Sequence, residues 1–410
     1  MTATAQPLSA ARPVKVVGII SMGHGLNHLF NMIVPPLAIT WTQDFDIGYV
    51  EVGAVMAASA ITSASAVLPV GFLVDRMPAR LVLIAGMTLM SLAVIGLGFA
   101  DAYWQLVAFA VLLGLGNTVF HPCDYSILSA TAPKAWLGRA FSVHTFAGYV
   151  GFALTPLIIS GALLWWSWRG ALILLGLIGL AMAATFWFNR HDLRDDRDLA
   201  LAQGGERQRP GIIDGLKLLF SLPLVMCFAF FLLVTIAMWG FDAFLPAALF
   251  EHNGLPEVMG NYALSAFFAA SAVGILIGGQ IADRTRRHGI VAAVGFGIAA
   301  VSILLIGELA AGPVLLFVLI VVAGIGGGIV TPNRDLIVRQ VTPPGQIGKV
   351  FAFMTVAMDS GSTIAPPAFG LLMDMGGAAW LFRLSALLLL LAILTVTATR
   401  HVHGRMEIRS

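Results

Sequence analysis

The sequence predicts an all-α membrane protein whose twelve transmembrane helices form two six-helix halves. Hydrophobic residues occupy 59% of the 410 positions and charged residues only 11%, whereas a soluble domain is about half apolar and a quarter charged. Apolar segments recur along the chain at lengths that can cross a hydrocarbon core of about 30 Å. The second half of the chain also repeats motifs of the first, which indicates two halves built on one plan.

Twelve apolar segments follow one another, and each is long enough for one helical crossing. They span 15–42, 49–74, 80–100, 103–131, 138–163, 168–189, 218–249, 257–282, 289–310, 312–341, 346–375 and 377–399. The charged stretch 190–217 separates the sixth from the seventh and predicts a solvated cytoplasmic linker. We therefore expect an N-terminal six-helix half at 1–189 and a C-terminal six-helix half at 218–410. Prolines inside several segments predict kinks. They are Pro35, Pro36, Pro122, Pro156, Pro246, Pro332, Pro366 and Pro367.

The internal repeat is visible in the residues that fix backbone shape and close packing. Residues 114–157 and 324–367 align without a gap at an offset of 210. The matched glycines and prolines are Gly114/Gly324, Gly116/Gly326, Pro122/Pro332, Pro133/Pro343, Gly138/Gly348, Gly151/Gly361 and Pro156/Pro366. A second echo relates 71–76 to 279–284 at an offset of 208. A parallel repeat in an apolar chain is typical of a secondary transporter.

Lysine and arginine predict the orientation. In a twelve-span arrangement, one side holds only Arg169 and Arg383, and the remaining loop cations fall on the other side. The positive-inside rule then places both termini and the linker in the cytoplasm, in a multi-pass protein of a bacterial-type cytoplasmic (inner) membrane. The basic residues anchor loops and form no continuous stripe with aromatic residues, so we expect no nucleic-acid partner.

Two of the predicted helices carry a stripe of polar side chains. The stripes follow helical spacing, at His24, Asn27, His28 and Asn31 in the first helix and at Asn117, His121, Asp124 and Tyr125 in the fourth. Lipid is a poor neighbour for such stripes, so they should face a cavity or another helix. The alternative to a substrate or proton pathway is interhelical hydrogen bonding, which such residues also provide.

Asp124 is the most costly of these residues, because a charge at the membrane centre costs about 2.5–3.5 kcal/mol on insertion scales. It aligns with Arg334 of the tenth helix. Asp335 has Arg339 available one turn later, which predicts that Arg334 is left to contact substrate or Asp124. The alternative for Arg334 is a structural ion pair.

Single carboxylates also occur in the seventh and eleventh helices, at Asp242 and Asp359. Each could carry a coupling proton or be a hydrogen-bonded structural acid. His144 in the fifth helix is predicted to be a packed, satisfied histidine. A metal site made from His24 and His28, with help from His121, Cys123 or Asp124, is a further alternative. The helical spacing, however, turns Cys123 away from the polar stripe, and we predict no resident metal.

Several functions are not supported by any motif. No Gly-x-x-x-x-Gly-Lys-[Ser/Thr] loop is present to bind ATP phosphates, and no Gly-x-Ser-x-Gly elbow is present. The chain is therefore not expected to be an enzyme or to need a cofactor. Transport would draw on an ion or substrate gradient.

The segment Gly71-Phe-Leu-Val-Asp75-Arg76-Met-Pro-Ala-Arg80 resembles the loop between helices 2 and 3 of the major facilitator superfamily. Pro78 replaces the usual second glycine and Ala79 one basic position. Ser21-Met-Gly-His24-Gly-Leu-Asn27 and Phe120-His121-Pro122 are similar to the fosmidomycin-resistance branch of drug exporters. That branch has Asp where His28 stands. The antiporter motif of the fifth helix is partial, because Thr155 replaces its glycine.

The resemblance implies a gate on the cytoplasmic side. It places Asp75, at the end of the second helix, against the start of the eleventh helix, whose N-terminus carries a partial positive charge. Arg76 and Arg80 could add ion pairs between the halves. The second copy of the motif contributes Asp283 and Arg284.

The leading hypothesis is a proton-coupled efflux antiporter of a small organic molecule or drug that works by alternating access as a monomer. Asp124 would bind the proton, with the charge of His28 or Arg334 influencing its proton affinity. One alternative is an importer or exchanger of a small organic anion that uses Arg334. Others are a transporter-like sensor and a metal or metal-chelate transporter.

Overall fold

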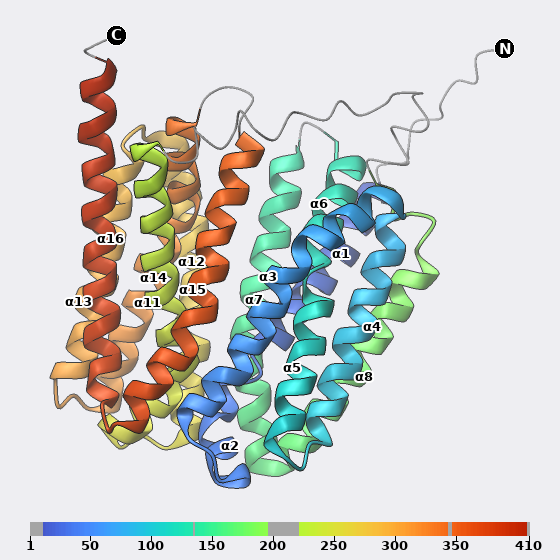
Figure 1. The fold of residues 1–410 in the computed structure, drawn as a ribbon, viewed down its shortest axis with the longest axis horizontal. Coiled ribbons are helices and arrows are strands. Elements are labelled where there is room, and N and C mark those ends of the chain that lie inside the picture. Colours follow the sequence, from blue (N-terminus) through green and yellow to red (C-terminus); the bar gives the residue numbers. More distant parts are fainter. Residues whose placement is uncertain (1–10, 134–135, 196–220, 343–346, 408–410) are drawn as a thin grey trace.

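The structure is a computed structural model that describes residues 11–133, 136–195, 221–342 and 347–407. Every regular element within these ranges is helical (Figure 1). The first group comprises α1 (Ala11–Asn31), η1 (Pro35–Leu37), α2 (Ala38–Phe45), α3 (Tyr49–Arg76), α4 (Ala79–Gly98), α5 (Tyr103–Asn117), α6 (Phe120–Thr131), α7 (Leu137–Trp165) and α8 (Trp168–Phe188). The second group comprises α11 (Leu222–Asn253), α12 (Glu257–Arg284), α13 (His288–Glu308), α14 (Pro313–Val341), α15 (Ile347–Asp374) and α16 (Ala378–Glu407).

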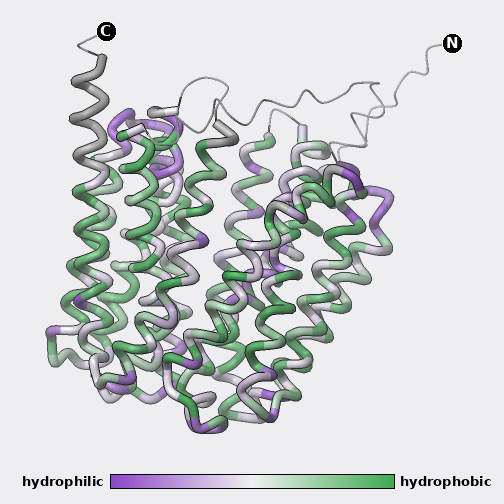
Figure 2. Tube along the Cα trace, viewed as in Figure 1, coloured by the Kyte–Doolittle hydropathy of each residue, from purple (hydrophilic) through white to green (hydrophobic). Residues whose placement is uncertain are grey.

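These helices make twelve passages through the bundle, as the sequence predicts. The first passage is α1 with η1 and α2, the fourth is α5 with α6, and each other passage is one helix. Ten spans of the described chain are long and apolar enough to cross a membrane. The passages missing from these ten are the first and the eleventh, which carry polar residues such as His24, Asn27 and Asp359. Hydrophobic residues dominate the helix bodies, and hydrophilic residues gather toward the ends (Figure 2).

The sequence repeat corresponds to repeated packing. A Cβ atom on Gly114 would collide with the Ser59 carbonyl oxygen of α3, and one on Gly324 would collide with the Phe267 carbonyl of α12. Ser59 and Phe267 are related by the offset of the second sequence echo. Gly116 and Gly326 likewise approach the carbonyl oxygens of Gly86 and Gly295, and a Cβ there would lie 2.8 Å and 2.7 Å away. The repeated glycines therefore let corresponding helices pack backbone to backbone in both groups.

The two groups of helices, called here the N-terminal half (α1–α8) and the C-terminal half (α11–α16), meet mainly through α3 with α15 and α7 with α12. We call the end at which α1 begins and α16 ends the terminal end, and the opposite end the far end. Figure 1 shows α3 and α15 converging at the far end and diverging toward the terminal end. The exact domain boundaries at 189/190 and 217/218 stay predictions, because residues 196–220 lie outside the described residues.

The first and fourth passages are interrupted within the bundle. Helix α1 ends at Asn31, and η1 begins at Pro35. Helix α5 ends at Asn117, and α6 begins at Phe120, just before Pro122. Proline has no N–H, so the carbonyl four residues earlier loses its helical donor. The expected kinks at Pro35, Pro36 and Pro122 are thus breaks, whereas Pro156, Pro246, Pro332, Pro366 and Pro367 lie inside continuous helices.

The start of the predicted linker packs in part against the N-terminal half, whereas the sequence predicts a solvated segment. Leu193 is fully buried, and the Asp195 carboxylate accepts a 2.6 Å hydrogen bond from the Ala79 backbone N–H at the start of α4. Asp192 accepts a 3.0 Å hydrogen bond from Lys15 of α1. A carboxylate at a helix N-terminus meets unpaired N–H groups and the positive end of the helix dipole, which explains why Asp195 binds at the start of α4.

Candidate functional site

The backbones of α1 and α7 pack closely together where the histidines of α1 lie. A Cβ on Gly151 would collide with the Gly25 carbonyl oxygen, and one on Gly25 would lie 2.9 Å from the Ala147 carbonyl oxygen. Gly148 faces the side chains themselves, because a Cβ there would lie 2.9 Å from the His28 ring and 3.2 Å from the His24 ring. The small residues of α7 therefore leave room for two imidazole rings between the helices.

His24, Asp124 and His144 form a buried trio contributed by α1, α6 and α7. His144 Nε2 lies 3.0 Å from Asp124 Oδ2 in a hydrogen bond. His24 Nδ1 lies 3.3 Å from the same oxygen, within ion-pair distance but without hydrogen-bond geometry. The side chains are at most 3% exposed. Among the described residues, Asp124 Oδ1 has no hydrogen-bond partner. A buried carboxyl with spare hydrogen-bonding capacity is costly to keep without a partner or a task.

Aromatic contacts extend the trio to an exposed edge. The His24 ring stacks on His144 with centroids 3.6 Å apart and lies 4.3 Å from His28. His121 is 5.3 Å from His24 and is itself exposed, as is Tyr125, 5.6 Å from His121. Two histidines thus contact the carboxylate, and two more, His28 and the exposed His121, pack against His24.

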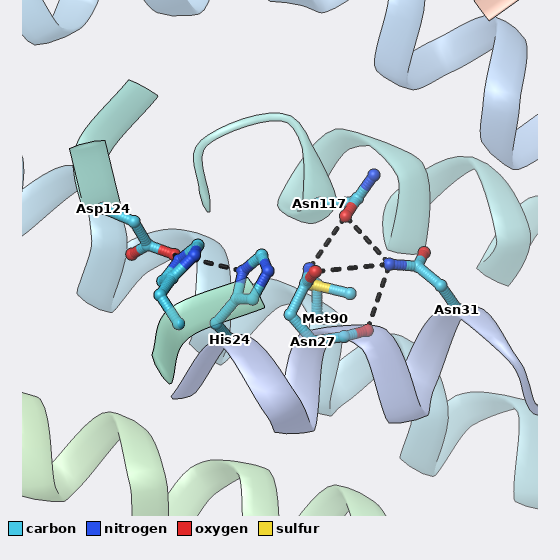
Figure 3. Close-up of polar contacts among 7 residues, drawn as sticks. His24, Asn27, Asn31, Met90, Asn117 and Asp124 are labelled. Carbon is cyan, nitrogen blue, oxygen red and sulfur yellow. Dashed lines mark hydrogen bonds and ion pairs between the residues drawn. The ribbon is translucent and has the colours of Figure 1, made fainter. Parts of the chain in front are cut away.

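The asparagines of α1 bind the end of α5 (Figure 3). Asn117 Oδ1 accepts a 2.8 Å hydrogen bond from Asn27 Nδ2 and a 2.9 Å hydrogen bond from Asn31 Nδ2. Asn117 Nδ2 donates to Ser63 Oγ of α3 at 3.1 Å, and Asn27 Nδ2 also contacts Met90 Sδ at 3.3 Å. The network lies at both helix breaks, because Asn31 and Asn117 are the last residues of α1 and α5. Discontinuous helices near the membrane midplane commonly form the binding sites of secondary transporters.

The surroundings of Arg334 correct one prediction. Arg334 Nε lies 3.2 Å from Asp335 Oδ1, so Asp335 pairs with its neighbour and not with Arg339 one turn later. The Arg334 guanidinium also lies 5.2 Å from the centroid of the Phe231 ring. Adjacent residues on a helix point about 100° apart, but a flexible arginine can turn back to reach the neighbouring carboxylate. Arg334 is therefore only partly available to a substrate, with its side chain 22% exposed, and Asp124 has His24 and His144 as its close partners.

The remaining predicted acids are isolated. Asp242 of α11 is 8% exposed, and among the described residues its Oδ1 atom has no hydrogen-bond partner. Asp359 of α15 is partly exposed, and its backbone carbonyl accepts a hydrogen bond from Ser362. The structure does not bring these acids into the histidine cluster.

The predicted cytoplasmic gate residues lie at the ends of helices at the terminal end. Asp75 and Arg76 close α3, Arg80 lies in the first turn of α4, and Asp283 and Arg284 close α12. The Asp75 side chain and those of residues 347–349 at the start of α15 lie outside the described residues. Arg76, Asp283 and Arg284 are exposed. The gate role of this set stays a prediction.

Sequence reasoning did not place His144, Ser63 and Met90 in the site. His144 is satisfied by a hydrogen bond, as predicted, but its partner is Asp124. A signal was present: His144, Gly148, Gly151 and Thr155 follow helical spacing on the face of α7 that packs on α1. Thr155 Oγ1 donates to the Leu29 carbonyl of α1 at 3.1 Å. A polar stripe interleaved with glycines marks a face that another backbone approaches closely.

The trio also has the composition of a metal site. One ligand atom each from His24, Asp124 and His144 lie within 4.8 Å of one another. Imidazole nitrogens with a carboxylate oxygen suit a divalent transition metal. The set differs from the predicted metal alternative, because His144 takes the place of His28 and the buried Cys123 is not part of it.

The fold has two helical halves and a polar site at broken membrane helices. This combination is typical of polytopic transport proteins. The chain belongs to the Major Facilitator Superfamily, whose family model matches residues 20–260 and 243–405. It is 23% identical over 403 residues to the fosmidomycin resistance protein of Escherichia coli K12, covering 96% of this chain and 95% of that protein. It is 24% identical over 362 residues to the D-galactonate transporter of Escherichia coli O6:H1, covering 80% and 82%.

A solved structure confirms the fold. A bacterial homolog of the human lysosomal transporter Spinster, in an inward-facing and occupied conformation, superposes with a TM-score of 0.81. The match covers 96% of this chain and 98% of that protein at 13% sequence identity. The chain is therefore a multi-pass membrane transporter of the major facilitator fold.

Proposed function

We propose that the chain is a proton-coupled antiporter that exports a small organic molecule across the bacterial inner membrane by alternating access. The observation that carries the proposal is the buried trio of His24, Asp124 and His144. Asp124 is a carboxyl group with one oxygen lacking a partner among the described residues, and it is linked to an exposed edge through His121. An ionisable group inside a membrane protein is costly and commonly marks a substrate or proton pathway.

The roles of the residues follow from their contacts. Asp124 Oδ2 lies 3.0 Å from His144 Nε2 in a hydrogen bond, so a proton can pass between the carboxyl and that imidazole, while His24 Nδ1 at 3.3 Å lies within ion-pair distance of the same oxygen. His28 and His121 extend the cluster to an exposed edge, and within the described part of the chain no Lys or Arg is among the ring and ion contacts of the trio. The Asn27–Asn31–Asn117 network occupies the adjacent helix breaks and offers amide groups to a polar solute. Efflux is supported by the similarity to the fosmidomycin resistance protein.

The test is transport in proteoliposomes with an imposed pH gradient, using fosmidomycin as the first probe. The wild type should move substrate only with the gradient. Asp124→Asn should abolish gradient-driven transport while still binding substrate, because an amide fits the site but does not release a proton. Glu308→Gln is the matched control, since Glu308 is an acid that pairs with Arg383 away from the cluster. Flux without a gradient, or wild-type pH dependence in Asp124→Asn, would move the coupling role to Asp242 or Asp359 or end the proton proposal.

The same cluster allows a sharp test of the metal alternative. If the cargo is a metal ion, Zn²⁺ should raise the unfolding temperature of the purified protein, and His24→Ala or His144→Ala should remove the effect. Binding to the folded state stabilises by mass action. Zn²⁺ stabilisation that depends on these two histidines, together with Zn²⁺ uptake, would replace the proton assignment.

A second candidate function is exchange or import of a small organic anion. It is favoured by the partly exposed guanidinium of Arg334 and by the similarity to the D-galactonate transporter. Arg334→Gln should then lose binding of galactonate, whereas Arg339→Gln, an exposed arginine in the next turn, should retain it. Equal binding by wild type and Arg334→Gln would exclude this use of Arg334.

A further inference from the structure

The far end holds a contact between the halves that the transport site does not include. The carboxylate of Asp374, the last residue of α15, accepts two backbone hydrogen bonds from the first residues of α3. Tyr49 N donates to Oδ1 at 2.7 Å, and Val50 N donates to Oδ2 at 2.8 Å. The first N–H groups of a helix have no partner within that helix. A side chain of the C-terminal half thus caps a helix of the N-terminal half.

The backbones of α3 and α15 touch at the same place. A Cβ on Gly53 would collide with the Pro366 carbonyl oxygen, and one on Gly370 would collide with the Tyr49 carbonyl oxygen. The two helices run antiparallel, since α3 begins and α15 ends at the far end. The contact therefore combines two glycine-permitted backbone approaches with one bidentate carboxylate cap.

The other acids at this junction also accept hydrogen bonds from uncharged donors. Tyr49 Oη donates to Glu251 at 3.2 Å, Thr40 Oγ1 donates to Glu257 at 2.9 Å, and Gly48 N donates to Glu51 at 3.0 Å. Two of these three bonds also join the halves. A carboxylate that accepts a hydrogen bond from a neutral donor makes a charge-assisted bond, which is stronger than a bond between two neutral groups. Separating the halves at the far end would break the Tyr49–Glu251 and Thr40–Glu257 bonds together with the Asp374 cap.

We propose that Asp374 is the latch of a far-end gate: its carboxylate holds the start of α3 while the far end is closed and releases it when the far end opens. The inference rests on the alternating-access mechanism proposed above and assigns a residue to one of its closed states. It also gives the α3–α15 pair a latch at the end opposite the gate predicted at Asp75.

The test measures distances between spin labels on the purified full chain in lipid nanodiscs. One pair, Gln43→Cys with Val314→Cys, reports on the far end, and another, Met77→Cys with Arg286→Cys, reports on the terminal end. All four positions are exposed, and the native Cys123 and Cys227 are buried, so the introduced thiols label selectively.

Asp374→Asn should shift the ratio of open to closed far ends by about tenfold, because an amide has one acceptor oxygen for two N–H donors. Terminal-end distances should shorten in the same molecules. Glu308→Gln is the matched control: Glu308 is a far-end acid that bonds to Arg383 within the C-terminal half, and the distances should not change.

Gly53→Ala distinguishes failure of the latch proposal from failure of the alternating-access mechanism. Its methyl group meets a backbone carbonyl of α15 and should wedge the far end open without touching the carboxylate. If Gly53→Ala shifts the distances and Asp374→Asn does not, the latch is wrong and alternating access stands. If neither variant shifts them, the far end does not open, and the proposed transport mechanism fails together with the latch.

Discussion

The two halves share a plan but differ at the positions that matter for chemistry. In the N-terminal half, the passages made by α1 and by α5 with α6 are broken and carry the polar networks. In the C-terminal half, the corresponding α11 and α14 are continuous. The repeat pairs His144 with Met354 and Asn117 with Gly327. The common glycines therefore maintain the packing, while a few substitutions place the site in one half.

The largest effect is expected for His144→Met, which gives the N-terminal half the residue found at the corresponding position 354 of the C-terminal half. The methionine side chain is similar in size, so little cavity forms, but Asp124 loses its 3.0 Å hydrogen bond. Losing a hydrogen bond to a charged group costs about 1.5–3 kcal/mol. We expect a lower free energy of unfolding and loss of gradient-driven transport. Unchanged values for both in chemical denaturation and proteoliposome assays would remove His144 from the site.

An intermediate effect is expected at the repeated glycines Gly151 and Gly361. Gly151→Ala should destabilise by about 1–3 kcal/mol, because its methyl group meets the backbone of α1. In Gly361→Ala, the new methyl group would lie 2.7 Å from the Thr235 side chain. Replacing glycine by alanine also stabilises a helix by up to about 1 kcal/mol. Gly361→Ala should therefore cost clearly less. The comparison is wrong if unfolding in detergent gives equal losses for the two variants.

The smallest effect is expected at Gly327, the counterpart of Asn117 in the C-terminal half. Asn117→Gly installs the residue found at position 327 and removes three side-chain hydrogen bonds, for a loss of about 1.5–4.5 kcal/mol in the free energy of unfolding at about 0.5–1.5 kcal/mol a bond. The converse change, Gly327→Asn, should stay within about 0.5 kcal/mol, since no neighbouring atom lies within 4 Å of a Cβ there. A larger loss for Gly327→Asn than for Asn117→Gly in thermal unfolding would contradict the assignment of the network to one half.

The sequence predicted the features that depend on local periodicity. The twelve passages follow from apolar length, and the stripes through His24 and Asp124 follow from helical spacing. It did not predict which helices would meet. Asp124 was expected near His28 or Arg334, but the fold presents His24 and His144, because the glycines of α7 bring that helix against α1. The pairing of Arg334 with Asp335 was missed for a related reason, since a flexible side chain is not confined to the i, i+4 direction.

All three members of the trio come from α1, α6 and α7, which belong to one half. A rigid-body rotation of the halves would leave the distances within the trio unchanged. A ligand shifts a conformational equilibrium only through different affinities for the two states. The proton would then be sensed through its surroundings: hydration of the exposed edge at His121 and Tyr125 would change as the halves close. The change in hydration would then couple protonation of the trio to the conformational equilibrium. The solvent accessibility of a probe attached at that edge measures this change.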